Sequence, residues 1–252
     1  DLGGKVPGTN AGDATDLFQE GLLIPPLKIV KAGVMNDDLR EMITANTRTP
    51  EVTWGDINAQ IKTNDYGQTK FAELFAKHGV ENVLACWQRW MEICEAELRR
   101  EIAKLPDGVW GPEHDWIDDD GIDLGKPYRI SVTLEKKGDT LTFKLDSDAQ
   151  ARGPINLRSC VSRNFIMCLV KMIFIPTLPV NDGLSRPVQV TYPPEGSLLN
   201  PKYPAPCNMY VRPSQMITNV VVRVLNRAVP GRVPCVVNMR VRSSAWMMPN
   251  CA

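Results

Sequence analysis

Two carboxylates frame the stretch of sequence whose residue types are best suited to chemistry. Asp1 and Glu20 stand at its ends, with Gly3-Gly4, Pro7-Gly8 and Gly12 between them. Glycine and proline allow tight turns and a close approach of the backbone to another group. The stretch is therefore typical of a rigid functional loop, in which Glu20 would contact substrate or transfer a proton. The structural alternative is an irregular surface connection in which Glu20 only caps local backbone groups.

An amide and a guanidinium follow the first predicted helix. The sequence Asn36-Asp37-Asp38 is typical of a helix N-terminus, and this helix is expected to run through about Ala45. Asn46 and Arg48 come directly after it, so they would present hydrogen-bond donors to a carbonyl or phosphoryl oxygen. The alternative is again structural, with Arg48 paired to an acidic neighbour such as Asp56.

Several other site chemistries lack their residue pattern in this chain. His78 and His114 do not have the spacing of zinc ligands, and no Gly-x-Ser-x-Gly motif supports a nucleophilic triad. No Walker-type phosphate loop occurs. The run Asp118-Asp119-Asp120-Gly121 lacks the alternate carboxylates of a calcium loop and indicates an acidic turn. The seven cysteines form no Cys-x-x-Cys pair and are expected as buried, reduced thiols of a cytoplasmic protein.

A series of short motifs follows the same order as in a known family. The series consists of Asp1-Leu2-Gly3-Gly4, Gln19-Glu20-Gly21, Ile24-Pro25-Pro26 with Lys28, Asn46-Thr47-Arg48 with Gly55-Asp56, Leu105-Pro106-Asp107-Gly108, Asp119-Asp120-Gly121, Gly153-Pro154-Ile155-Asn156, Asn181-Asp182-Gly183, and Pro194-Glu195-Gly196-Ser197 with Asn200-Pro201. With these motifs the chain resembles the B-type subunits of hydantoinases, a family that includes 5-oxoprolinase and the acetone and acetophenone carboxylases. The resemblance makes residues 1–234 part of a hydantoinase B-like catalytic domain, while residues 235–252 form a tail without family resemblance.

The resemblance implies a subunit of an enzyme. Members of the family use ATP to phosphorylate an amide or enolate oxygen, and a separate A-type subunit binds the ATP. The B-type subunit handles the carbonyl chemistry near a divalent metal, here zinc or manganese. The main expectation is therefore a B-type subunit of an ATP-dependent hydrolase that opens the ring of a small cyclic amide. Two alternatives stay open, an ATP-dependent ketone carboxylase subunit with a ketone substrate and a non-catalytic assembly subunit.

The resemblance also implies roles for individual residues. Most metal ligands of the family precede the Asp-Leu-Gly-Gly segment, so Asp1 is expected beside the metal, either as a ligand or holding a ligand histidine. Glu20, Asn46 and Arg48 are expected at the same reaction site. Because the upstream ligands lie outside this chain, we expect a partial member of the family, with apolar faces that a partner subunit covers.

The elements that must position these side chains begin with a helical section up to about residue 105. Residues 51–62 predict a second helix, which Asn64-Asp65-Tyr66-Gly67 is expected to interrupt before a further helical stretch ends at His78-Gly79. Residues 80–105 predict a long amphipathic helix, and its tryptophans, Trp87 and Trp90, are expected in the core.

After Gly108 the apolar period changes from helical to alternating. Residues 109–117 predict a strand, and residues 128–135 and 140–145 predict a hairpin that turns at Lys137-Gly138-Asp139. A helix around Cys160 and Ile166, a strand at 188–192 and a last helix from Ser214 follow. The expected fold class is α+β, with a helical layer (about 37–105) followed by an antiparallel hairpin-based sheet, further helices and long Pro-rich loops.

Composition limits the classes of partner. Lys+Arg and Asp+Glu both number 29, and no basic run interleaves with aromatic residues, which argues against nucleic acid. The longest apolar run, residues 165–179, contains Lys171 and two prolines, so no membrane span is predicted. Hydrophobic residues make up 43% of the chain, enough for a sizeable core.

Overall fold

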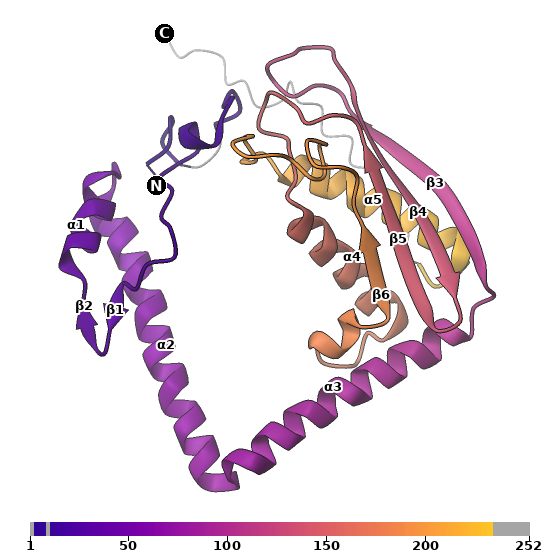
Figure 1. Ribbon diagram of the computed structural model, residues 1–252, viewed down its shortest axis with the longest axis horizontal. Coiled ribbons are helices and arrows are strands. Elements are labelled where there is room, and N and C mark those ends of the chain that lie inside the picture. Colours follow the sequence, from indigo (N-terminus) through magenta and orange to yellow (C-terminus); the bar gives the residue numbers. More distant parts are fainter. Residues whose placement is uncertain (1–2, 9–10, 234–252) are drawn as a thin grey trace.

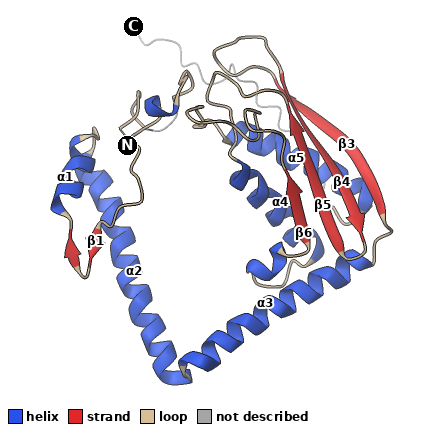
Figure 2. Cartoon of the chain, in the orientation of Figure 1, coloured by secondary structure: helices blue, strands red, loops and turns tan. Residues whose placement is uncertain are grey.

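The structure, a computed structural model, describes residues 3–8 and 11–233. The expected tail, residues 235–252, and Asp1 lie outside these ranges. In chain order the elements are η1 (Leu17–Gln19), β1 (Val30–Lys31), β2 (Val34–Met35), α1 (Asp37–Ala45), α2 (Pro50–His78), α3 (Val80–Ala103), β3 (Gly108–Ile117), β4 (Tyr128–Lys137), β5 (Thr140–Ser147), α4 (Ser159–Phe174), η2 (Asp182–Ser185), β6 (Val188–Thr191) and α5 (Val211–Ala228). An α+β fold is confirmed (Figure 2).

One four-stranded sheet organises the body of the molecule. Its strands lie in the order β3-β4-β5-β6, with β3, β4 and β5 antiparallel and β6 parallel to β5. The predicted hairpin is confirmed, because Lys137 pairs with Thr140 across the turn and the ladder continues to Ile130 and Ser147. A small separate hairpin, β1-β2, precedes α1.

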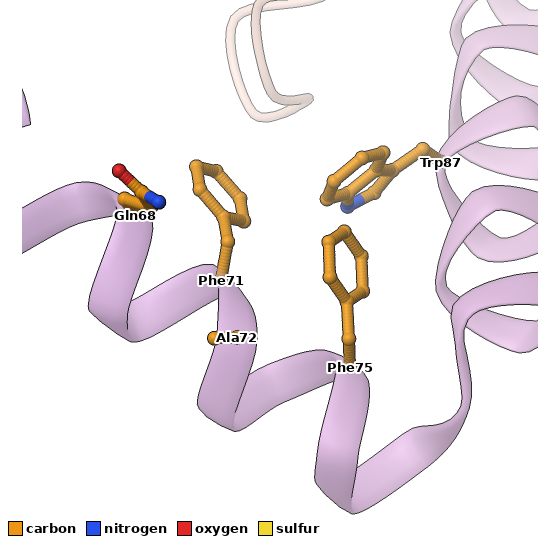
Figure 3. A pocket seen from close by; sticks show the side chains of 5 residues that line it. All are labelled: Gln68, Phe71, Ala72, Phe75 and Trp87. Carbon is orange, nitrogen blue, oxygen red and sulfur yellow. The ribbon is translucent and has the colours of Figure 1, made fainter. Parts of the chain in front are cut away.

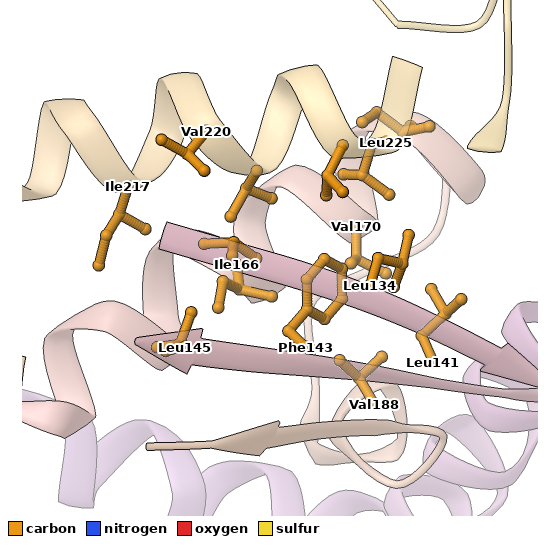
Figure 4. Packing of buried hydrophobic residues seen from close by; sticks show 14 of the residues in the cluster. Leu134, Leu141, Phe143, Leu145, Ile166, Val170, Val188, Ile217, Val220 and Leu225 are labelled. Carbon is orange, nitrogen blue, oxygen red and sulfur yellow. The ribbon is translucent and has the colours of Figure 1, made fainter. Parts of the chain in front are cut away.

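Alternation along β4 and β5 decides which side of the sheet becomes the core. Leu134, Phe143 and Leu145 face α4 and α5, and Figure 4 shows them meeting Val170 and Leu225 of those helices. All five side chains are buried. The intervening positions on the other side carry polar pairs such as Lys144–Glu135. Each strand therefore has one apolar and one polar side, as expected for a sheet covered by helices on one face.

The helical section is more continuous than the sequence predicted. α1 begins after Asn36, whose side chain accepts the N–H of Leu39 (3.1 Å), and this cap is confirmed. The expected interruption at residues 64–67 is wrong, because α2 runs unbroken for 29 residues to His78. Asn, Asp and Gly inside a helix each cost only about 1 kcal/mol or less. Ending the helix there would instead leave a new set of unpaired backbone groups.

α2 and α3 form a V whose vertex is at Gly79 (Figure 1). Only the second half of α3 joins the body, through Cys94, Leu98 and Ile102. The first half projects, so Trp87 and Trp90 keep 41% and 44% of their surface exposed, and their expected core position is wrong. Helical periodicity showed an apolar stripe correctly but could not show where along the helix the body ends.

The tip of the V holds a small aromatic cluster. Phe71 and Phe75 of α2 meet Trp87 of α3, with ring centroids 5.8 and 6.1 Å apart, around an open apolar notch (Figure 3). Gln68 and Ala72 complete its lining. The notch carries no charged or catalytic side chain, so it is not the site that the sequence predicts.

The cysteines also differ in their burial. Cys94 is buried, but Cys86, Cys160 and Cys168 are exposed, so the expectation of buried thiols is wrong for these three. Cys160 and Cys168, which lie eight residues apart on α4, are both exposed. Within the ranges that the structure describes, no helix combines the length and apolarity needed to cross a membrane.

Candidate functional site

The N-terminal loop lies against the loop that leads into α5 (Figure 1). The backbone N–H of Leu17 donates to the carbonyl of Pro204 (2.9 Å), and the ring of Phe18 meets Tyr203 edge-on at 6.0 Å. Asp16 caps the short helix η1 by accepting the N–H groups of Phe18 and Gln19. We call this contact of residues 3–8 and 11–21 with residues 203–210 the seam.

Glu20 is the polar centre of the seam. One carboxylate oxygen, Oε1, accepts the backbone N–H groups of Cys207 (2.6 Å) and Asn208 (2.5 Å). Burial raises the pKa of Glu20, and these two N–H groups and the charge of Arg158 oppose that rise. Glu20 therefore does cap backbone groups, but they belong to a segment 187 residues away and not to its own neighbourhood.

Three further residues at the seam carry polar groups that the sequence did not single out. Arg158, which directly precedes α4, contacts the thiol of Cys207. Burial raises the pKa of that thiol, and Arg158 opposes the rise. The side-chain nitrogen Nδ2 of Asn208 is covered and has no hydrogen-bond partner. A covered amide donor without a partner is rare in folded proteins, so it marks this place as unusual.

Arg48 holds the N-terminal loop from the other side. Its guanidinium donates to the carbonyls of Gly4 (2.9 Å), Lys5 (3.4 Å) and Val6 (3.4 Å). Asn46 ends α1, where its side chain donates to the carbonyl of Met42 (2.7 Å). Both side chains thus meet backbone carbonyls of the protein in this structure.

Two glycines make this close packing possible. A Cβ on Gly3 would lie 2.3 Å from the carbonyl oxygen of Asn46, and one on Gly4 would lie 2.6 Å from that of Glu20. No real side chain tolerates such distances, so the Gly3-Gly4 pair is needed where the loop passes between Asn46 and Glu20. Glu20, the backbone of Asn46 and the guanidinium of Arg48 all lie against the N-terminal loop, while Asp1 lies outside the described residues.

A buried polar scaffold holds the neighbouring loops. Asp120 accepts the hydroxyl of Tyr128 (3.0 Å) and the N–H groups of Gly153 (2.8 Å), Ile122 (2.9 Å) and Asp123 (2.7 Å). Burial would raise the pKa of Asp120, but these four donors together lower it. The predicted acidic turn is confirmed, and its carboxylate is structural.

Asn156 continues the scaffold towards the seam. It is fully buried, and its Nδ2 donates to the carbonyls of Ala151 (3.0 Å), Gly153 (3.2 Å) and Pro206 (2.9 Å). The segment of Pro206 is the one that presents the Cys207 and Asn208 N–H groups to Glu20. The seam is therefore built on a rigid, hydrogen-bonded base.

The residues present do not complete a metal centre by themselves. Across residues 3–8 and 11–233, no three His, Cys, Asp or Glu side chains come together as a possible set of ligands. Glu20 is engaged by two backbone N–H groups, and Asp120 by three backbone N–H groups and the hydroxyl of Tyr128. The expected metal therefore has no ligand set among these side chains.

Comparison with known proteins gives one consistent result. A family model described as hydantoinase B/oxoprolinase matches residues 1–248. Caprolactamase subunit beta of Pseudomonas jessenii is 30% identical over 234 residues, which cover 92% of this chain and 40% of that protein. The crystal structure of the ATP-dependent caprolactamase superposes with a TM-score of 0.82 at 30% identity, over 92% of this chain and 40% of the other.

Two further proteins are similar to this chain. An uncharacterized protein of Methanocaldococcus jannaschii is 30% identical over 239 residues, covering 94% of this chain and 41% of its own length. Acetophenone carboxylase delta subunit of Aromatoleum aromaticum is 26% identical over 185 residues, covering 73% and 27%. The chain thus spans about two fifths of the length of the relatives with 30% identity.

Proposed function

Because the chain belongs to the hydantoinase B/oxoprolinase family, we propose that it acts within the B-type subunit of an ATP-dependent cyclic-amide hydrolase. The observation that carries this proposal is the match to caprolactamase, in both sequence and structure, over 92% of the chain. The substrate would be a lactam or imide ring, whose carbonyl ATP activates before the ring opens.

The proposal includes partners and cofactors. ATP would be bound by an A-type partner subunit, and relatives of this chain are themselves named as subunits. Large apolar side chains of α2 and α3 are exposed, among them Phe71, Leu84 and Trp87. Their exposure supports an assembly in which a partner subunit covers them. A zinc or manganese ion would have Asp1 as a ligand or neighbour in the complete enzyme. The exposed free thiols support a reducing, cytoplasmic location.

The geometry of the seam supports the following proposed roles. Glu20 would contact substrate or transfer a proton, since its two backbone donors leave acceptor capacity on a carboxylate that binds about four. Arg48 and Asn46 would keep the loop in place and present donors to a carbonyl or phosphoryl oxygen when the loop shifts.

A ketone carboxylase is the second candidate. The 26% identity with acetophenone carboxylase delta subunit favours it specifically. Both candidates use ATP on a carbonyl compound. They differ in the substrate and in the fate of the activated oxygen, so one assay separates them.

The test is reconstitution of the complete B-type subunit with its A-type partner. We expect ADP release that depends on a cyclic amide, measured with ε-caprolactam, hydantoin and 5-oxoproline, and one ring opened for each substrate-dependent ATP. ADP release that instead requires a ketone and bicarbonate would assign the carboxylase. No substrate-dependent ATP hydrolysis would favour an assembly role and reject both enzymes.

Site variants in the same complex test the residues. Asp1→Asn is expected to lower bound metal, measured by elemental analysis, and to reduce turnover at least tenfold. Glu20→Gln is expected to reduce turnover similarly while metal is retained. Asp13→Asn, which changes an exposed carboxylate of the same loop, is the control and should leave both values near those of the parent. Parent-like turnover and metal in both site variants would remove the assignment.

A further inference from the structure

The N-terminal loop, α1 and α2 are tied to one another. The guanidinium of Arg48, which lies between the two helices in sequence, donates to the carbonyls of residues 4–6 over 2.9 to 3.4 Å. α1 packs along α2, and the guanidinium of Arg40 lies 5.8 Å from the ring centroid of Trp54. Residues 3–8 and 11–78 therefore form one connected unit, which we call the arm.

The arm joins the body at the vertex of the V (Figure 1). Gly79 ends α2 and begins α3 with φ at +80°, and a Cβ on it would have only Nδ2 of Asn82 within 4 Å, at 3.6 Å. The rings of Phe71, Phe75 and Trp87 beside this joint are only partly covered, and no residue of α2 is buried. A glycine with free space around it can absorb the backbone change of a hinge.

The arm meets the body again at the seam. The contacts there are the close approach of Gly12 to Gly121, the hydrogen bond from Leu17 to Pro204, the edge-on rings of Phe18 and Tyr203, and the bonds of Glu20 to Cys207 and Asn208. Phe18 and Tyr203 keep 61% and 64% of their surface exposed, so the seam covers little apolar surface. Water replaces hydrogen bonds that are lost on separation, and the seam can therefore separate while the body stays folded.

We propose that the arm pivots as one rigid unit about the joint at Gly79, and that Glu20 is the residue that holds it closed against the body. In the closed position, Oε1 of Glu20 is occupied by the N–H groups of Cys207 and Asn208. Opening removes both donors, so the position of the arm decides whether this carboxylate is available to another group. The inference goes beyond the proposed function, because it applies equally to a hydrolase, a carboxylase and an assembly subunit.

Amide hydrogen exchange of the complete B-type subunit, resolved residue by residue, tests the pivot. The N–H groups of Leu17, Cys207 and Asn208 all form hydrogen bonds across the seam, although they belong to two segments far apart in sequence. One opening motion exposes all three together. We therefore expect their protection factors to agree within about threefold.

Two neighbouring amides serve as internal references. The N–H of Lys5 donates to the carbonyl of Gln19 within the arm (2.7 Å), and that of Met209 donates to the carbonyl of Pro154 within the body (2.9 Å). A rigid pivot leaves both bonds intact. These two amides should therefore be protected at least tenfold more than the three amides of the seam.

Variants of Glu20 test which residue holds the arm closed. In Glu20→Ala we expect exchange at Leu17, whose N–H bonds Pro204 and not Glu20, to rise at least tenfold while Lys5 and Met209 keep their parent rates. Glu20→Gln keeps an acceptor oxygen and should give a smaller rise. Asp13→Asn is the matched control, because this exposed carboxylate pairs with Lys5 inside the arm (2.6 Å) and should leave exchange across the seam unchanged.

A distance measurement follows the motion itself. Keto amino acids at the exposed positions Tyr66 on α2 and Trp116 on β3 carry two spin labels and leave the native cysteines unlabelled. We expect one main distance between the labels in the parent. Glu20→Ala should raise the ratio of longer to main distance at least tenfold, and Asp13→Asn should keep the parent distribution.

Three results would overturn the proposal. They are exchange of Lys5 or Met209 at the rate of the seam amides, parent-like exchange at Leu17 in Glu20→Ala, and an unchanged distance distribution in that variant. The first result would mean that the loops unravel and that no rigid arm moves. Neither measurement uses ATP or a substrate, so failure of the pivot and failure of the proposed hydrolase are seen in different experiments.

Discussion

At the residue scale, Glu20 joins two segments that lie at opposite ends of the sequence. Glu20→Ala removes the acceptor of two backbone N–H groups, and we expect it to lower the free energy of unfolding by about 1–3 kcal/mol. Glu20→Gln keeps an acceptor oxygen and should cost less. Urea unfolding of the parent and both variants checks the order. Equal stability of all three proteins would contradict a stabilising contact between Glu20 and the N–H groups of Cys207 and Asn208.

The raised pKa of Glu20 adds a pH dependence with a definite sign. Between its ordinary value of 4.5 and its higher pKa in the folded chain, the folded state holds more proton than the unfolded state. Stability from this group therefore falls as pH rises through that window. Unfolding measured from pH 4.5 upwards should show this slope in the parent and lose it in Glu20→Gln.

Asp120 changes the stability with pH in the opposite direction to Glu20. Its pKa lies below the ordinary value of 3.8, so its contribution is present above pH 3.8 and is lost as pH falls through the lower folded value. Asp120→Asn breaks a carboxylate that accepts four bonds, and should cost about 2–3 kcal/mol at pH 7. Asp118→Asn, an exposed neighbour, is the control. Thermal unfolding of both variants at pH 7 and pH 3 measures the difference, and equal effects would refute the role of Asp120.

At the scale of elements, the contact between η2 and α3 depends on one glycine. A Cβ on Gly183 would lie 2.0 Å from the backbone oxygen of Met91. Gly183→Ala must separate the two elements, so we expect a loss of about 1–3 kcal/mol in urea unfolding.

A second glycine predicts the opposite result. Gly67 lies inside α2, and a Cβ there would meet nothing within 4 Å. Gly67→Ala is therefore expected to stabilise α2 by about 0.5–1 kcal/mol, because alanine loses less backbone freedom in a helix. Circular dichroism during thermal unfolding compares the two variants. Similar effects of both would show that close approach at Gly183 is unimportant.

At the scale of the whole molecule, α2 and the sheet-based body differ in the packing that stabilises them. α2 has no buried residue along its 29 positions, whereas β4, β5 and α5 each contribute several residues to the core. Helices of this length draw most of their stability from packing. Amide hydrogen exchange by mass spectrometry should therefore find peptides of α2 exchanging far faster than those of β4 and β5 in the chain alone. Equal protection would mean that α2 is held by contacts that this structure does not contain.

Much of the fold followed from the sequence because the interactions that decide it are local. The Asn36 cap, the glycine at the end of α2 and the alternation on either side of Gly138 each act over a few residues. The α+β class and the hairpin were predicted from these signals. The order of the family motifs and the loop from Gly3 to Glu20 were also readable without a structure.

Tertiary structure alone decided the partners and the exposure of these residues. Glu20 could meet Cys207 and Asn208 only once the chain folded back over 187 residues, and no local pattern marks such a pairing. Arg158 and Asn208 carry no motif that would have singled them out. Trp87 lies on a correctly predicted apolar stripe yet stays exposed, because burial depends on what packs against a helix and not on its periodicity.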